Sequence, residues 1–511
     1  MTSITPTSKS GLPAKIQTAP VKVQASCGVT QVQWDNDQAC TPIGQLVFFT
    51  QFLECSGLLE NWLLEAPLFY KSNNAPQPRD ILCTMMLSIL AGHNRFCNME
   101  QIYGDTVSAQ VLKLKKIYSD DSTRRGIKRM DEKAALKWLE DNQRYCWGPM
   151  LTRSWILDID STVKPVFGRQ QEGAAIGYNP VRPGRPSYSY HSYFIANTRI
   201  SLGVEVRPGN EHAGSFALPR LFQFIDQLDA SQLPYLIRGD VSYGSDAMMK
   251  ACEERSLKYL FKLKMSAKIK ELIQCSQSSD TLWEDAGQGW KGYKTKIRLS
   301  TWEEERAVVI QRRQRKAKAS INKKKNISDQ EKEQFLFPEI MEESLQEWEY
   351  SVLVTNLNDS VKAIAQHYRD RGDCENNYDE YKNQWGWGGY VTKDLRTTRI
   401  MAAMVALVAN WWNIYTRLAI PTKHAEAITS RPWLLEAVGR LILTGGQRLI
   451  RLSTNNSDAQ KIVEVTQKIA KFLSSLTAEQ LDPKLRWAAI IKRAFIFFEL
   501  KEQAQMIPKI E

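Results

Sequence analysis

The hydrophobic pattern of the chain changes its period near residue 154, and this change limits the folds that the chain can adopt. From about 42 to 148, apolar residues recur at helical spacing, as in ILCTMMLSILAGHNRF. After 154, three strand-like runs follow in succession, and the order then becomes helix, strand, helix, strand. The strand-like runs are SWILDID, SYHSYFIANTRI, SLGVEVRPG, PYLIRGD and LKYLFKLK. This order predicts a mixed α/β layer that follows a helical region.

Three other regions have patterns of their own. Residues 1–30 are polar and rich in Ser, Thr and Pro, which predicts a flexible arm. Residues 271–358 combine Gly- and Trp-rich turns, strand-like runs and a strongly basic segment, which indicates a β-rich insertion with a long charged loop. Helical patterns resume near 359 and continue almost to the C-terminus, with RLIRLS as a candidate short strand.

The charge of the chain favours a polyanionic partner. The formal net charge is +12 and the pI is about 9.1, as is common for proteins that bind nucleic acids. Ser122 and Thr123 precede RRGIKRMDEKAALKWLEDNQRYCW, which is typical of a capped helix that opens with basic residues. Short basic helices suit a DNA-binding helical domain such as a helix-turn-helix. A helical bundle of another kind is an equally good interpretation.

Other features predict a cytoplasmic protein without a membrane partner. The nine cysteines include no CxxC pair, which argues against a disulfide framework and a zinc ribbon. The N-terminus has no apolar segment of the kind found in secretory signals. The longest apolar run, IMAAMVALVA at 400–409, is about half a membrane span and predicts a buried helix.

Two predicted strands end in an aspartate. Asp160 closes WILDID, and Asp240 closes YLIRGD. Carboxylates at the carboxyl ends of neighbouring strands lie where α/β sheets place their sites, whereas a single strand-terminal Asp more often caps a turn or a helix. Asp158 shares a strand face with Asp160, so periodicity does not choose between them. Asp160 is nearer to the turn and is the better candidate ligand.

The segment YRDRGDCENNYDEYKNQ at 368–384 predicts a helix with one charged face. At about 100° per residue, Tyr368, Arg371, Glu375 and Lys382 fall within a stripe about 60° wide. On such a face the carboxylate suits metal and the cations suit phosphate. A solvated helix with i,i+4 ion pairs is the alternative interpretation.

A metal site follows if this helix packs beside the two strand ends. Asp160, Asp240 and Glu375 would then converge. Three oxygen ligands without a His or Cys cluster favour Mg²⁺ or Mn²⁺ over zinc. Two such ions about 3.5–4 Å apart can activate a water or a 3′-hydroxyl and stabilise the leaving oxygen of a phosphodiester.

These residues resemble a known family. The spacing Y-x2-R-x3-E-x6-K of the charged stripe is similar to the Y-R-E-K signature of the DDE transposases encoded by bacterial insertion sequences. Asp160 in DIDST and Asp240 in IRGDVSYGSD resemble the first and second aspartates of that family. GRQQEGAAIGYNPVRPGRPSY at 168–188 and RPGNEH at 207–212 are similar to the branch called the insertion-sequence family numbered 1380, or DDE group 1. The resemblance covers about 150–415.

The resemblance implies a fold and a domain order. It implies an α/β RNase H-like catalytic core, a mixed sheet flanked by helices, that a β-rich insertion interrupts between the second Asp and the Glu. Helical N- and C-terminal domains flank this core. The expected domains are a flexible arm (1–30), a helical DNA-binding domain (31–148), the first part of the core (149–270), the insertion (271–358), the second part of the core with the Glu helix (359–420) and a helical C-terminal domain (421–511).

The resemblance also implies an activity. The protein would bind terminal inverted repeats, cleave DNA at transposon ends and join the 3′-hydroxyl ends to target DNA, as in cut-and-paste transposition. Asp160, Asp240 and Glu375 would be catalytic residues that bind two Mg²⁺ ions, with Mn²⁺ able to substitute. The expected partners are double-stranded DNA and, in the DNA complex, a second copy of the chain that is contacted by helices after 425. The expected location is the bacterial cytoplasm, on the nucleoid when DNA is bound.

Further residues are candidates for DNA contact. In related enzymes the Tyr, Arg and Lys of the signature hold phosphates, which we carry over to Tyr368, Arg371 and Lys382. Tryptophans of the insertion could stack on a flipped base if a DNA hairpin forms, although a place in the sheet core is the more usual role. These tryptophans are Trp283, Trp290, Trp302 and Trp348. The basic run that follows is either a DNA-backbone contact or a solvated loop, and its candidate residues are Arg312, Arg313, Lys323 and Lys324.

Two other functions compete with an active transposase. A non-transposing nuclease or resolvase on the same RNase H-like core would need the carboxylates but not the Tyr–Arg–Lys stripe or the large insertion. A catalytically retired transposase that acts as a DNA-binding protein would show the loss of a carboxylate, and all three are present. The sequence therefore favours the active enzyme.

Overall fold

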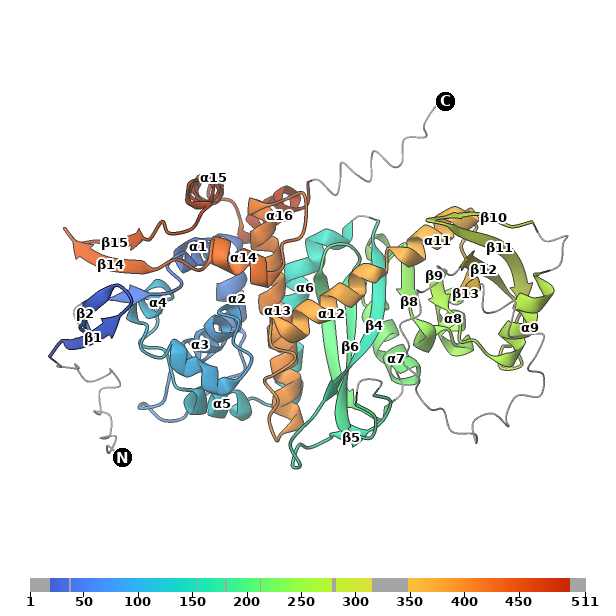
Figure 1. Cartoon of the computed structure of the whole chain (residues 1–511), viewed down its shortest axis with the longest axis horizontal. Helices are drawn as coiled ribbons and strands as arrows, with labels where there is room; N and C mark the ends of the chain where they lie inside the picture. The colour runs from blue at the N-terminus through green and yellow to red at the C-terminus, as the bar shows by residue number, and fades with distance from the viewer. Residues whose placement is uncertain are drawn as a thin grey trace, which may run out of the picture.

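The computed structural model describes residues 19–496 except 36–37, 153, 180–181, 212, 278–281 and 315–347. In this part of the chain, a helical body and a mixed β-sheet lie end to end (Figure 1). The long helix α13, Leu395–Ala419, stands between them.

The mixed sheet contains the α/β layer expected after residue 154. Its central strands are β4 (Ile156–Pro165), β6 (Pro186–Ile195), β7 (Ile200–Pro208), β8 (Leu236–Gly239) and β9 (Lys258–Lys262). They lie side by side in the order β7-β6-β4-β8-β9. β6 runs antiparallel to β7 and β4, whereas β4, β8 and β9 are parallel. The short strand β5 (Ala175–Ile176) also pairs with β6.

The strands expected in the insertion extend this sheet and do not form a separate layer. The elements of this region are α9 (Ala267–Cys275), β10 (Glu284–Gly287), β11 (Trp290–Ile297), β12 (Arg306–Gln314) and β13 (Trp348–Thr355). β13 pairs antiparallel with β9, and β12, β11 and β10 follow outward. The free edge of β9 offers backbone groups to any strand. Periodicity predicts these strands but does not say which edge they join.

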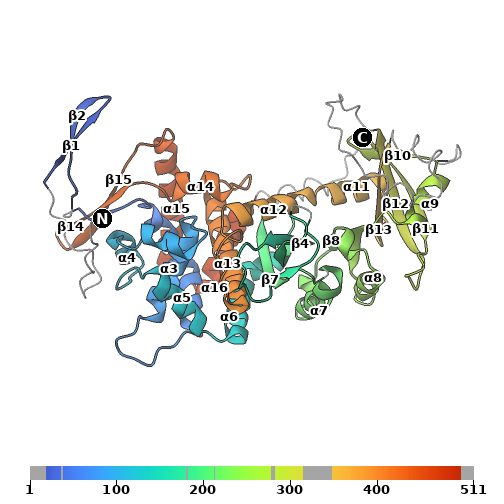
Figure 2. The same cartoon turned by 60° about the horizontal axis from the view of Figure 1, so that its bottom comes forward.

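Helices cover both faces of the central strands (Figure 2). On one face lie α7 (Ala213–Ile225) and α8 (Asp246–Glu253). On the other lie α11 (Val361–Arg369) and α12 (Gly372–Asn383), which cross the sheet almost as one rod (Figure 1). The polar face of β4 is thus covered by the segment that carries the charged stripe.

Helices from both ends of the chain pack into one helical body. Its N-terminal helices are α1 (Leu46–Ser56), α2 (Leu58–Leu64), α3 (Pro78–Leu90), α4 (Thr106–Val111), α5 (Asp120–Arg129) and α6 (Glu132–Trp147). Its C-terminal helices are α14 (Ala427–Leu434), α15 (Ala459–Ala478) and α16 (Pro483–Ala494).

The contact between α1 and the C-terminal helices joins the two ends. Gln51 Nε2 donates to the carbonyl of Ala470 at 3.2 Å, and the rings of Phe52 and Trp487 are 6.1 Å apart. The segments expected as two separate helical domains are therefore parts of one body. Amphipathic spacing shows that a helix has an apolar face, but not which helix covers it.

Two β-hairpins differ from the expected pattern. β1 (Val21–Ala25) lies in the described part of the expected flexible arm and pairs with β2 (Gly28–Val32), which begins there and ends just beyond it. β14 (Gly439–Thr444) and β15 (Gln447–Leu452) pair within the C-terminal segment expected to be helical, and the candidate strand RLIRLS is confirmed as part of this hairpin. β3 (Cys40–Thr41) pairs with β14. Glycines with positive φ lie at the turns of both hairpins. These glycines favour a hairpin at each place, although the composition of the surrounding segments predicted a flexible arm and helices.

The expected basic helix after Thr123 is divided in two. The Ser119 side chain caps α5, and the Asp131 carboxylate accepts from the N–H of Ala134 at 2.9 Å to cap α6. An Asp at this place begins a new helix because its oxygen satisfies an N–H that the helix leaves free. The short 3₁₀ helices of the chain are η1 (Phe96–Gln101), η2 (Gly148–Thr152), η3 (Ala230–Gln232) and η4 (Val241–Tyr243).

Helix α13 connects the helical body to the sheet. Its side chains are buried around almost the whole circumference, as expected for the apolar run at 400–409. Buried Asn410 accepts from the N–H of Ser201 at 2.9 Å and donates to its carbonyl at 2.7 Å, which ties α13 to β7. None of the helices within the described ranges is long and apolar enough to cross a membrane.

A buried ion pair joins β4 to β8. Arg238 Nε and Nη2 donate to the two oxygens of Asp158, each at 2.7 Å, and both side chains are almost fully buried. Arg238 also donates to the carbonyl of His367 at the end of α11. Removing one partner of such a pair leaves an uncompensated buried charge, which is strongly destabilising.

We therefore expect Arg238→Met to lower the free energy of unfolding by about 3–5 kcal/mol, measured by urea denaturation of the whole chain. Arg124→Met is the matched control, because Arg124 pairs with Asp121 on the exposed surface of α5 and its loss should cost about 0–1 kcal/mol. Equal effects of the two substitutions would contradict a structural role for the buried pair.

The sheet also contains a buried histidine. His191 on β6 is 2% exposed, and neither ring nitrogen has a hydrogen-bond partner within the part of the chain that the structure describes. Burial lowers the pKa of His191 from 6.5 to about 4, with smaller effects from Glu205, which raises it, and Arg207, which lowers it. Between about pH 4 and pH 6.5, the imidazole is therefore neutral in the folded protein and protonated in the unfolded chain.

We expect the free energy of unfolding to fall as the pH falls from about 6.5 to about 4, because the unfolded chain then binds a proton that the folded chain does not. His191→Gln should reduce this fall. The measurement is urea denaturation of both proteins at several pH values. Parallel pH profiles would show that His191 does not contribute.

Candidate active site

The two aspartates predicted at strand ends lie level with each other at one edge of two adjacent parallel strands. β4 pairs with β8 from Ile156 to Ile159, and Ile159 is opposite Gly239. The next residue of each strand is Asp160 on β4 and Asp240 after β8. Asp160 was expected to end its strand, and this is wrong: β4 continues to Pro165 because its other partner, β6, pairs with it over that whole length.

Asp160 is held by two donors. Its Oδ2 is 2.8 Å from Arg371 Nη2, and its Oδ1 accepts from the N–H of Ser161 at 2.7 Å. Burial raises the pKa of Asp160 to about 6, the Arg371 charge lowers it, and the neighbouring charge of Asp240 raises it. The pKa of this carboxyl group therefore lies close to neutral pH, and a further cation beside it would lower that pKa.

Asp240 has a structural role and a free oxygen. Its Oδ1 accepts from the N–H of Ser242 at 2.8 Å and caps η4. This is the capping role that a strand-terminal Asp commonly has. Its Oδ2 has no hydrogen bond to any residue that the structure describes, so this oxygen can take a ligand without breaking the cap.

The segment at 368–384 was expected to form one helix, but it contains the end of α11 and the whole of α12. Tyr368 lies in the last turn of α11, and Glu375 lies in the first turn of α12. Asp370 and Arg371 between them keep right-handed backbone angles near those of a 3₁₀ turn, with φ of −63° and −64° and ψ of −17° and −18°. The tighter turn points Arg371 into the protein, where it is buried, while Glu375 is exposed.

Helix α12 is fixed over β4 and β6 by its inner face. The hydroxyl of Tyr378 bonds that of Ser192, which is the β6 residue opposite Asp160. The ring of Tyr378 also lies edge-on to Phe194, with centroids 5.9 Å apart. These contacts hold the charged segment against the strand that carries Asp160.

The phenol of Tyr368 is affected by all three carboxyl groups. Burial raises the pKa of Tyr368 to about 12, the Arg371 charge lowers it, and the charges of Asp240, Asp160 and Glu375 raise it further. The three predicted carboxylates therefore share the electrostatic neighbourhood of Tyr368, but their expected convergence into one metal site is not seen in this structure. Within the described ranges, no three His, Cys, Asp or Glu side chains are close enough together to hold a metal ion.

Two lysines extend this neighbourhood along β4. Lys382 Nζ donates to the carbonyl of Val163 at 3.2 Å. Lys164 is 6% exposed, donates to the carbonyl of Gly389 and lies 5.8 Å from the ring centroid of Tyr190. Burial lowers the pKa of Lys164 to about 7, and the charge of Lys382 lowers it further.

Lys164 was not among the residues predicted from the sequence. Neither lysine forms an ion pair with a carboxylate that the structure describes, although the charges of Asp160 and Asp379 raise the pKa of Lys382 against the larger lowering by burial. The available signal was strand alternation, because Lys164 is four residues after Asp160 and therefore lies on the same face of β4.

The predicted DNA contacts of the insertion lie in another part of the sheet, since β9 and β13 separate β8 from β12. Arg312 lies over the rings of Trp283 and Trp348, at 3.8 and 4.6 Å from their centroids. Trp302 is only 4% exposed, as expected for a sheet-core residue.

The neighbouring Arg313 has partners of its own. It pairs with Glu349 at 2.7 Å and lies 4.8 Å from the ring centroid of Trp290. Lys323 and Lys324 lie outside the described residues. A role of the insertion in DNA contact stays a prediction.

Comparisons with known proteins address the family. A family model described as "Transposase DDE domain group 1" matches residues 71–474. A search of the curated proteins finds no match. Among solved structures, a similar one is a cryo-EM structure of piggyBac transposase in a synaptic complex with hairpin DNA. It is 10% identical, the likeness covers 90% of this chain and 88% of that chain, and the TM-score is 0.38.

The matched segment includes Asp160, Asp240 and the whole Tyr–Arg–Glu–Lys stripe. It also spans well over half of the chain, which confirms the resemblance drawn from these residues. The protein therefore belongs to the DDE transposases, in the family of transposase DDE domain group 1.

Proposed function

We propose that the protein is an active transposase that binds terminal inverted repeats, cleaves DNA at transposon ends and joins the 3′-hydroxyl ends to target DNA by cut and paste. The observation that carries this proposal is the level placement of Asp160 and Asp240 on adjacent parallel strands, under the helices of the charged stripe. The strand order β7-β6-β4-β8-β9, with only β6 antiparallel to its neighbours, supports the RNase H-like core implied by the family resemblance.

The donor set fits a hard divalent cation. Asp160, Asp240 and Glu375 offer only carboxylate oxygens, which Mg²⁺ and Mn²⁺ prefer. Burial and the nearby charge of Asp240 both disfavour the ionised form of Asp160, so a cation beside it would be stabilising. We propose that these three residues hold two Mg²⁺ ions, for which Mn²⁺ can substitute. When bound, the metal activates a water or a 3′-hydroxyl and stabilises the leaving oxygen.

Arg371 takes the place of a cation at Asp160 in this structure. Its guanidinium is 2.8 Å from the carboxylate and also donates to the carbonyl of Ile159 at 3.3 Å. A planar guanidinium binds a carboxylate or a phosphate equally well. We infer that Arg371 moves from Asp160 to a DNA phosphate when substrate binds, and so releases the carboxylate for metal.

Lys164 and Lys382 would hold the DNA backbone beside the carboxylates. Their two charges are adjacent and lack carboxylate partners among the described residues. A phosphate between them would neutralise both and would favour the charged form of buried Lys164. Tyr368 would hold a phosphate by its hydroxyl. Since a transposase must bring two DNA ends together, we expect a homodimer in the DNA complex.

Glu375→Gln should abolish cleavage while end binding remains largely intact, because the amide keeps the size of the side chain but is a poor metal ligand. The measurement uses labelled duplex from the DNA that flanks the gene, with Mg²⁺ as the variable, and scores nicks and binding separately.

Asp379→Asn is the matched control, since it removes the same charge from an exposed position one turn along α12 and should leave cleavage intact. Retained cleavage in Glu375→Gln would remove this residue from the metal site. Binding without cleavage by the unmodified protein would favour a retired transposase.

Lys164→Gln should weaken DNA binding and reduce the slope of log K against log salt by about 1, while the free energy of unfolding stays equal or rises because a buried charge is removed. The readouts are fluorescence anisotropy over a salt series and urea denaturation.

Lys250→Gln serves as its control, because Lys250 is exposed and already paired with Glu303 at 2.7 Å. If Lys164→Gln keeps the full salt slope, the buried lysine does not contact phosphate.

A further inference from the structure

The hairpin of β14 and β15 is a regular two-stranded ribbon. Six residue pairs run in register from Gly439↔Leu452 to Thr444↔Gln447. Gly445 and Gly446 form the turn with φ of 56° and 74°, the two positive values that a tight two-residue turn requires. A Cβ on either glycine would meet no other atom, so these glycines serve the backbone conformation of the tip and not its packing.

Most of this ribbon projects away from the rest of the protein. It is held at its base, where β14 pairs with β3 and the N–H of Leu441 donates to the carbonyl of Ala39 at 2.9 Å. Its outer half extends beyond the helical body, at the end of the molecule opposite β10–β12 (Figures 1 and 2). Leu443 is 69% exposed and Leu449 is 42% exposed. The ribbon therefore contributes little to the core.

The charge of the ribbon is entirely positive. The segment 437–456 contains three arginines and no Asp or Glu. Arg440 and Arg451 are directly opposite each other on one face, both exposed, and no described carboxylate pairs with them. Like charges at opposite positions destabilise a strand pair. The sequence thus keeps an arrangement that costs folding free energy, which indicates an anionic partner.

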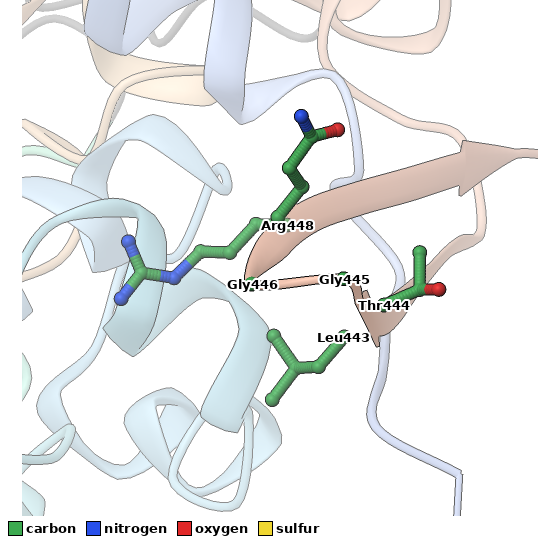
Figure 3. A pocket seen from close by; sticks show the side chains of 6 residues that line it. Leu443, Thr444, Gly445, Gly446 and Arg448 are labelled. Atoms are coloured by element: carbon green, nitrogen blue, oxygen red, sulfur yellow. The ribbon is translucent and has the colours of Figure 1, made fainter.

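Polar side chains occupy the tip. Strand alternation places Thr444 and Gln447 on the same face as Arg440 and Arg451. Arg448 and Leu443 extend from the other side of the ribbon (Figure 3). The face with the two arginines thus has cations near the base and hydrogen-bonding groups at the end.

We propose that the β14–β15 ribbon enters the major groove of DNA, with Arg440 and Arg451 on backbone phosphates and Thr444 and Gln447 on base edges. This inference rests on the proposed function, because it assigns one interface for the DNA. A two-stranded ribbon fits the width of the major groove, and Gln can bond the edge of adenine there. Guanidinium groups at the base are suited to fix the register on the phosphates.

Charge favours DNA over a second copy of the chain as the partner. Two ribbons paired face to face about a two-fold axis would bring together Arg440 and Arg451 of both copies, without a carboxylate in either ribbon. A duplex supplies phosphates for the arginines, and thymine methyl groups can contact exposed Leu449, which lies on the same face as Arg440 and Arg451.

The test uses the full chain with Arg440→Gln and Arg451→Gln combined, and separately with Gln447→Ala. Binding to end duplex and to scrambled duplex is followed by anisotropy over a salt series without Mg²⁺, so that catalysis does not enter. The double variant should bind more weakly, with a salt slope lower by about 2. Gln447→Ala should keep the slope and lose preference for the end duplex. Lys250→Gln is the control, since Lys250 is exposed and already pairs with Glu303.

The outcomes separate this inference from the proposed function. If the ribbon variants keep both slope and preference while the unmodified protein binds and cleaves end duplex, only the ribbon interface is overturned. If the unmodified protein binds no DNA, both proposals fail. If the double variant changes the sedimentation of the free protein and not its DNA binding, the ribbon is a contact between copies and the DNA assignment is wrong.

Discussion

The hydrogen-bond register between β4 and β8 determines where the candidate catalytic groups lie. Because Ile159 is opposite Gly239, the next residue of each strand is an aspartate on the same edge of the sheet. A shift of one residue would turn Asp160 to the opposite face. Arg238 binds Asp158 across the same two strands, so one buried ion pair supports the register on which the site depends.

The cations around these carboxylates differ in the groups that bind them and neutralise their charge. Arg238 is tied to Asp158 and to a backbone carbonyl, which suits a structural role. Arg371 binds Asp160 at the border of the site, where metal and phosphate could replace that contact. Lys164 and Lys382 form no ion pair with a described carboxylate, and each donates to a backbone carbonyl instead. The two lysines thus place positive charge beside the carboxylates that a bound polyanion would balance.

Local patterns predicted much of the fold and of the site. Strand alternation and helical spacing located the central strands, Asp240 after β8, and the helical segment that carries Tyr368 and Glu375, because these signals depend only on neighbouring residues. These local signals gave wrong or incomplete predictions where the structure depends on residues far away in the sequence. β4 continues past Asp160 because β6 pairs with it, and the strands of the insertion join the edge of β9. Lys164 could be assigned a face but not its burial, which comes from α12 and the Gly389 loop.

By itself, the sequence determined the family, the residue types of the site and the order of helices and strands, because all of these are indicated by residues at short spacings in the sequence. Only the tertiary structure decided that Asp160 is held by Arg371, that two lysines share one side of the site, and that both ends of the chain form a single helical body. The physical reason is that each of these contacts joins residues far apart in the chain. Their formation depends on how buried faces pack and on which charges burial leaves unpaired.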